Sequence, residues 1–127
     1  MKNKRLVILV TGLMLVSLVL AGCGGKPEFP TGKFIQSGTT DYGLMFKSDG
    51  TFSVFEGDTT FVTGTYSVDV NVFTETSNTG GCSTDVSFTY TFDGTNLTFN
   101  YVGDPADDVA CGGRNADFNN VTYTLSK

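Results

Sequence analysis

Histidine and tryptophan are both absent from the 127 residues of this sequence. Without histidine, the chain lacks the commonest general base and zinc ligand, and every Ser-His or Cys-His catalytic arrangement is excluded. Only three cysteines are present, and no two of them have the Cys-x-x-Cys spacing of a dithiol redox site. Glu75 and Asp85 would make an acid–base pair only within one cleft, and nothing in the sequence places them in one. We therefore expect no enzyme, with no catalytic residue, cofactor or metal site.

Basic residues are also scarce, with 8 against 13 acidic ones and a net charge of −5. Three of the basic residues, Lys2, Lys4 and Arg5, stand at the N-terminus. Without them the chain has 5 basic and 13 acidic residues, a net charge of −8. This acidity argues against nucleic acid as a partner and against direct adsorption to anionic lipid.

The N-terminus combines a short basic segment with an apolar run. The three basic residues precede an apolar run over residues 6–20. About fifteen residues are too few for a comfortable membrane span but suit the core of a signal peptide. The tetrapeptide Leu20-Ala21-Gly22-Cys23 ends this segment, and it resembles the lipobox of bacterial lipoproteins.

The lipobox resemblance implies cleavage before Cys23 and lipidation of its sulfur. Residues 1–22 would then be a signal peptide, residues 23–31 a tether rich in Gly and Pro, and residues 32–127 the folded domain. Each buried CH₂ of an acyl chain such as palmitate contributes roughly 0.8 kcal/mol, so two or three chains hold a small domain stably on a bilayer. The expected location is the extracytoplasmic side of the cell membrane or outer membrane. The alternatives are a plain secretory signal and an uncleaved transmembrane helix.

The rest of the chain has the composition of β-strands. All 11 Phe and all 5 Tyr follow Cys23, and Thr and Val are frequent, whereas Ala, Leu, Glu and Lys are scarce. After Gly32 no long run has helical spacing. Strands are instead predicted over residues 32–36, 42–46, 52–54, 61–68, 72–77, 86–92, 97–101 and 121–125.

Two hairpins carry the clearest register predictions. Asp93-Gly94 is a strong two-residue turn signal, and it pairs Phe92 with Thr95, Tyr90 with Leu97, Phe88 with Phe99, and Val86 with Tyr101. A loop over residues 48–50 with a left-handed Gly50 sets Phe46 opposite Phe52 and Leu44 opposite Val54. In each hairpin, the predicted register gathers the large apolar side chains on one face of the sheet.

Hairpin connections between all these strands predict an up-and-down meander. A turn at residues 69–71 leaves open whether Val72 or Phe73 faces inward, and Val70 is a poor turn residue where Gly would be easier. About eight short antiparallel strands around one aromatic face can remove their edges by closing into a barrel. We predict an all-β antiparallel barrel preceded by an N-terminal signal helix, with an open sandwich as the alternative.

Four short motifs lie along residues 32–127. They are Gly32-Lys33-Phe34, Gly64-Thr65-Tyr66-Ser67-Val68-Asp69, Tyr90-Thr91-Phe92-Asp93-Gly94, and Cys82 with Asp104-Pro105 and Cys111-Gly112-Gly113-Arg114. Together these motifs resemble the calycins, the lipocalin-like barrels found in small bacterial lipoproteins. The resemblance implies a small lipocalin-like barrel, although Phe34 stands where lipocalins have tryptophan.

Cys82 and Cys111 are expected to form a structural disulfide. Cys82 precedes the strand that begins at Val86 and Cys111 follows the strand that ends at Tyr101, so both lie at the end of that hairpin away from its turn. An extracytoplasmic compartment lets a disulfide persist. Closing a loop of about 28 residues stabilises the fold by roughly 3–4 kcal/mol in the chain-entropy model.

The acidic segment before the last strand is expected to be a solvated loop. Asp104, Asp107 and Asp108, with Asp117 further on, offer the oxygen ligands that Ca²⁺ takes, but their spacing matches no calcium loop. Arg114 is the one arginine after Cys23, and we expect it to pair with one of these aspartates.

Eight aromatic residues with inward alternation allow two functions. They could fill the barrel as a packed core, which their number and the short strands favour, or line a cavity for a small apolar ligand. A packed core suits a structural or interaction module of the cell envelope, with Phe55, Phe61 and Phe118 as candidates for an exposed patch. A cavity suits a carrier of an apolar ligand. The eight residues are Phe46, Phe52, Tyr66, Phe88, Tyr90, Phe99, Tyr101 and Tyr123.

Replacing Cys23 by Ser should release the protein from membranes or leave it unprocessed, because the sulfur that takes the lipid is gone. Membrane fractionation with gel mobility compares the Cys23→Ser variant with wild type and with Ser37→Ala, a control outside the lipobox. A Cys23→Ser product of mature size that stays in the membrane fraction would show that the anchor is assigned wrongly.

Overall fold

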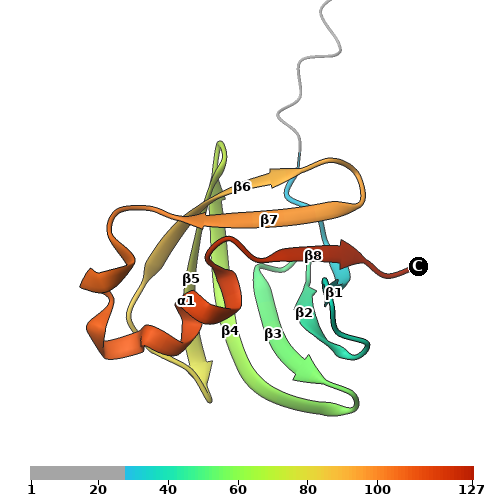
Figure 1. Cartoon of the computed structure of the whole chain (residues 1–127), viewed down its shortest axis with the longest axis horizontal. Coiled ribbons are helices and arrows are strands. Elements are labelled where there is room, and N and C mark those ends of the chain that lie inside the picture. Colours follow the sequence, from blue (N-terminus) through green and yellow to red (C-terminus); the bar gives the residue numbers. More distant parts are fainter. Residues whose placement is uncertain (1–27) are drawn as a thin grey trace, which may run out of the picture.

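The computed structural model describes residues 28–127, which fold into eight antiparallel strands and one short helix (Figure 1). The predicted signal helix over residues 1–22 and the lipidation residue Cys23 lie outside the described residues. Two single turns of 3-10 helix, η1 (Pro105–Asp107) and η2 (Val109–Cys111), and the α-helix α1 (Gly112–Phe118) separate the last two strands. The strands are β1 (Gly32–Gln36), β2 (Tyr42–Phe46), β3 (Thr51–Glu56), β4 (Thr59–Asp69), β5 (Val72–Thr79), β6 (Val86–Phe92), β7 (Asn96–Tyr101) and β8 (Thr122–Leu125).

The sheet closes on itself. Each strand pairs antiparallel with the next, and β8 returns to β1, where Leu125 lies opposite Phe34. The prediction of an all-β up-and-down barrel is confirmed, and the alternative of an open sandwich is wrong. Pairing of β8 with β1 satisfies backbone groups that the edges of an open sheet would expose.

The predicted register of the β2–β3 hairpin is confirmed. Phe46 lies opposite Phe52 and Leu44 opposite Val54. Gly50 has a φ of 83°, in the left-handed region that its loop requires.

The predicted register of the β6–β7 hairpin is wrong by two residues, because Phe88 lies opposite Tyr101 and not opposite Phe99. The cause is the side chain of Asp93. Its Oδ1 accepts hydrogen bonds from the backbone N–H groups of Thr95, at 2.9 Å, and Asn96, at 2.6 Å. These bonds stabilise a loop longer than a two-residue turn. A shift of two residues keeps every side chain on its face, so the set of inward residues is unchanged.

The β4–β5 turn settles which residue of β5 faces inward. Phe73 is fully buried, whereas Val72 is half-buried. Val70 has a φ of 57°, a conformation that costs a β-branched residue roughly 1–2 kcal/mol, and its side chain is 68% exposed. Tyr90 on β6 holds the turn, since its N–H donates to the carbonyl of Asn71 at 3.0 Å.

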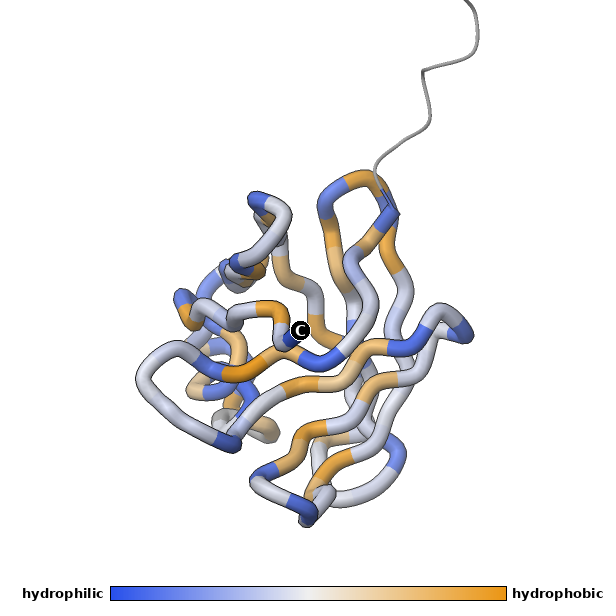
Figure 2. Tube along the Cα trace, turned by 90° about the vertical axis from the view of Figure 1, so that its right-hand side faces the viewer, coloured by the Kyte–Doolittle hydropathy of each residue, from blue (hydrophilic) through white to orange (hydrophobic). Residues whose placement is uncertain are grey.

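Aromatic rings fill the interior of the barrel. Hydrophobic and polar positions alternate along the strands (Figure 2), so one face of each strand supplies the core. Ring centroids of Phe73 and Phe99 are 5.0 Å apart, and those of Phe46 and Phe73 are 5.6 Å apart. These are the separations of aromatic pairs in direct contact. The rings contact one another, which is the packed core favoured by the sequence.

Phe29, in the predicted tether, closes one end of the barrel. Its ring lies 5.1 Å from that of Phe46, 5.3 Å from that of Phe73 and 4.9 Å from that of Tyr90. This contact could not be predicted from the sequence, because Phe29 stands alone between prolines and belongs to no alternating run. The described chain therefore enters the barrel at the end that carries the β4–β5 turn (Figure 1).

Helix α1 lies at the opposite end of the barrel, and it was not predicted from the sequence. Phe118 at its end is 2% exposed and packs against Phe52, Phe73 and Phe88, with ring centroids 6.4, 6.0 and 5.2 Å away. Its two opening glycines are poor helix formers. The helix is thus fixed by what it packs against and not by its own propensity.

Replacing Phe88 by Ala should lower the free energy of unfolding by about 3–5 kcal/mol, because a ring with 0% exposure leaves a cavity behind. Phe61, which is 46% exposed on β4, is the matched control, and Phe61→Ala should cost less than about 1 kcal/mol. Chemical denaturation measures both. Equal losses in the two variants would contradict a packed interior.

Candidate functional site

All eight aromatic residues predicted to face inward belong to the core or pack against it. Tyr66, Tyr90 and Tyr101 are partly buried at its margin. Phe46, Phe52, Phe88, Phe99 and Tyr123 are buried, at 3% exposure or less. The fold therefore brings these residues together as packing, and Phe52 also borders the cavity described next.

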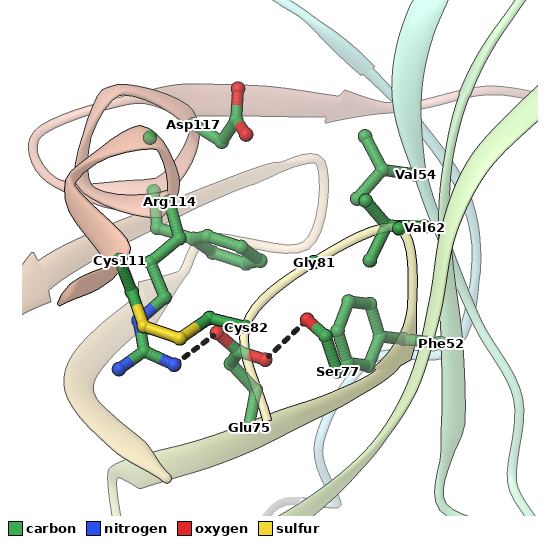
Figure 3. A pocket seen from close by; sticks show the side chains of 13 residues that line it. Phe52, Val54, Val62, Glu75, Ser77, Gly81, Cys82, Cys111, Arg114 and Asp117 are labelled. Atoms are coloured by element: carbon green, nitrogen blue, oxygen red, sulfur yellow. Dashed lines mark hydrogen bonds and ion pairs between the residues drawn. A yellow bond between two sulfur atoms is a disulfide. The ribbon is translucent and has the colours of Figure 1, made fainter. Parts of the chain in front are cut away.

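A cavity of about 350 Å³ lies at the α1 end of the barrel (Figure 3). Its apolar wall comes from β3, β4 and the end of α1. Its polar wall combines the inward face of β5 with Arg114 and Asp117 of α1, and the 80–82 segment with Cys111 forms the rim. The lining residues are Phe52, Val54, Val62, Glu75, Ser77, Gly80, Gly81, Cys82, Cys111, Gly113, Arg114, Asp117 and Phe118.

Glu75 is the charged residue at the base of this cavity. It follows Phe73 by two residues on β5, so the strand's alternation turns its carboxylate inward, and it is only 1% exposed. Its Oε1 lies 3.4 Å from Nη1 of Arg114, and its Oε2 accepts from the Ser77 hydroxyl at 3.4 Å. Both contacts are drawn in Figure 3.

Arg114 is held mainly by other groups. Its Nε and Nη2 donate to the two carboxylate oxygens of Asp108 at 2.9 and 3.0 Å, and its Nη1 also donates to the carbonyl of Thr84. The expected pairing of Arg114 with an aspartate of the loop is confirmed. Glu75 could not be predicted as a further partner of Arg114, because 39 residues separate the two.

Burial raises the pKa of Glu75 to about 7, against an ordinary value of 4.5. The loss of hydration outweighs the opposing attraction of Arg114, whose contact is long. Burial opposes the charge of Arg114, but the hydrogen bond to Asp108 and the attraction of Glu75 and Asp108 together outweigh it and raise the pKa of Arg114, so Arg114 stays charged. Near neutral pH the cavity therefore holds a fixed cation beside an acid that can gain or lose its proton.

The Cys82–Cys111 disulfide is present, as predicted, with the two Cα atoms 5.6 Å apart. Cys82 lies at the cavity rim, shortly after the end of β5, and Cys111 immediately precedes α1. The bond therefore ties the start of α1 to the barrel beside Arg114 (Figure 3).

Two other tethers hold the far end of α1. The hydroxyl of Tyr42 donates to Asp117 Oδ1 at 2.7 Å, and the hydroxyl of Tyr123 donates to the backbone carbonyl of Asp117. Burial, followed by the nearby Asp117, raises the pKa of Tyr42. The cavity wall contributed by α1 is thus fixed at both ends.

Three of the four aspartates considered as calcium ligands have separate structural partners, and the fourth, Asp107, is exposed. Asp104 accepts from the N–H of Ala106 at the start of η1, while Asp108 binds Arg114 and Asp117 binds Tyr42. Across residues 28–127, no three acidic, cysteine or histidine side chains gather in a metal-binding group.

Burial corrects two of the three residues expected to form an exposed aromatic patch. Phe55 and Phe118, which were candidates for an exposed patch, are only 7% and 2% exposed. Of the three candidates, Phe61 alone is exposed.

Glu75 and Asp85 lie on opposite sides of the sheet. Asp85 is exposed and accepts a hydrogen bond from Thr76, which faces outward. They do not share a cleft.

No family model, curated protein or solved structure matches the chain. In the part of the chain that the structure describes, no helix has the length and hydropathy to cross a membrane.

The stability of wild type relative to Glu75→Gln should fall as pH rises from about 4.5 to 7. A folded pKa above the unfolded one means that folding favours the protonated acid, so this contribution is complete below 4.5 and is lost as pH passes 7. The relative loss should approach about 3 kcal/mol, since each pKa unit corresponds to roughly 1.4 kcal/mol. Chemical denaturation of both proteins between pH 4 and 8 measures the difference. A difference that does not vary with pH would contradict the burial of an ionisable Glu75.

Proposed function

We propose that this chain is a lipid-anchored lipoprotein of the cell envelope, on the extracytoplasmic side, whose barrel is an interaction or binding module. The lipobox at residues 20–23 supports the anchor, and the structural disulfide fits an oxidising compartment. The calycin resemblance of residues 32–127 fits the closed barrel.

The observation that carries this proposal is the placement of the two barrel ends. Phe29 packs against Tyr66 and Phe73, beside the β4–β5 turn. The cavity is lined by Val62 and Ser77, which lie toward the other ends of the same two strands. An anchor at Cys23 would therefore reach the barrel at one end and leave the cavity directed away from the membrane.

The alternative is a carrier of a small apolar ligand inside the barrel. The interior that such a ligand would need is occupied by rings in mutual contact, including Phe73 and Phe99. The cavity at the α1 end has an apolar wall, but a buried carboxylate and an arginine stand opposite it. This chemistry favours a ligand or partner with a polar group over a purely apolar one.

On lipid vesicles, a fluorescent amino acid at position 70 should be quenched by nitroxide-labelled lipid much more than one at position 109. Val70 lies in the β4–β5 turn and Val109 in η2 beside the cavity, and they are 68% and 86% exposed, so they form a matched pair. Equal quenching, or stronger quenching at position 109, would rule out the proposed orientation.

A further inference from the structure

Glu75 is a buried carboxylate with acceptor capacity left over. Its oxygens have one protein contact each, both at 3.4 Å. Hydrogen bonds between charged groups are usually about 2.7–2.9 Å long, and each carboxylate oxygen can accept two. A buried acid that borders a cavity with such loose contacts can still accept hydrogen bonds from a bound group.

The charge of Glu75 is not needed to balance Arg114. Asp108 already matches that guanidinium through two hydrogen bonds, and the carbonyl of Thr84 accepts a third. Asp117 adds a second carboxylate to the cavity lining. When Glu75 is ionised, the cavity and its immediate surroundings therefore carry more negative than positive charge, and a cation is the ligand that complements them.

The remaining walls define the body of that ligand. Phe52, Val54, Val62 and Phe118 form an apolar surface facing the polar wall. A volume of about 350 Å³ is at the small end of ligand sites and suits a molecule with one charged head and a short apolar body.

We infer that this cavity binds a primary ammonium group, whose N–H groups donate to Glu75 and Ser77 while its apolar body lies against the opposite wall. The inference deepens the proposed function and rests on it, because it names the chemistry that the outward-facing end recognises. A free small amine and the lysine side chain of an envelope protein both present this group.

Binding should be coupled to the loss of a proton. Arg114 and Ser77 contact Glu75, Asp108 lies behind Arg114, and Asp117 stands on the α1 side of the cavity. With a pKa of about 7, Glu75 is partly protonated at neutral pH, and only its ionised form attracts the ammonium group. The affinity should therefore rise roughly tenfold from pH 6 to pH 8.

Benzylammonium tests the inference on the purified full chain, by titration followed with nitrogen-15 chemical shifts. Saturable binding at one site is expected, with shifts centred on Ser77, Gly81 and Arg114. Benzyl alcohol has the same body without the charge, and benzoate reverses the charge. Both should bind at least tenfold more weakly. Equal binding of benzyl alcohol, stronger binding of benzoate, or no saturable binding of benzylammonium would overturn the inference.

Three variants separate the site from general effects on the fold. Glu75→Gln keeps the shape and removes the charge, so it should weaken benzylammonium binding about tenfold or more and abolish its pH dependence. Asp85→Asn removes an exposed carboxylate from the outer side of the sheet and should change nothing. Val62→Phe fills the cavity from a half-buried position without touching the acid, and it should also block binding even if Glu75→Gln fails to fold.

A second titration distinguishes the two sources of the ammonium group. The peptide acetyl-Gly-Lys-Gly-amide should compete with benzylammonium if the natural partner is a lysine side chain, and should not if the ligand is a free amine. Either result supports the shared chemistry. Failure of both probes would remove the ammonium site, whereas the anchor and the orientation are judged separately by fractionation and lipid quenching.

Discussion

The space inside a closed eight-stranded sheet is the constraint on which the rest of this structure depends. Such a barrel is just wide enough for its inward side chains to fill it. Here many of these side chains are phenylalanines, and Phe29 and Phe118 add rings from outside the strands. The middle of the barrel is consequently packed with side chains, so open space inside the barrel can lie only near its two ends. One end is closed by Phe29, and the other is covered by α1, which leaves a cavity beneath it.

The polar group at the covered end costs stability. A buried ion pair seldom recovers the hydration that its members lose, and a packed apolar pair of similar volume is often as stable. The Glu75–Arg114 contact is long and Arg114 has a better partner in Asp108, so the structure would lose little attraction if Glu75 were apolar. A carboxylate that faces an open volume and contributes so little stability fits the proposed role of binding a cation.

The faces of the strands could be predicted from the sequence because alternation is a local property, whereas features set by side-chain hydrogen bonds or distant contacts could not. The β6–β7 register changed because Asp93 bonds to the backbone of its own loop. The helix that begins with Gly112 and Gly113 could not be predicted, because tertiary contacts, and not propensity, form it. Glu75 could not be assigned to the interior because the sequence left open whether Val72 or Phe73 faces inward. Once Phe73 is known to face inward, period-two alternation places Glu75 inward as well.

The Cys82–Cys111 bond makes the attachment of the cavity wall depend on the oxidation state of two cysteines. The eight strands draw their stability from the ring-filled core, while the wall that carries Arg114 is joined to the barrel next to the disulfide. A reduced chain could close its barrel yet hold α1 less firmly, with Glu75 facing solvent across a loosened wall. At the proposed extracytoplasmic location, oxidation of these two cysteines would be the step that fixes this wall against the barrel.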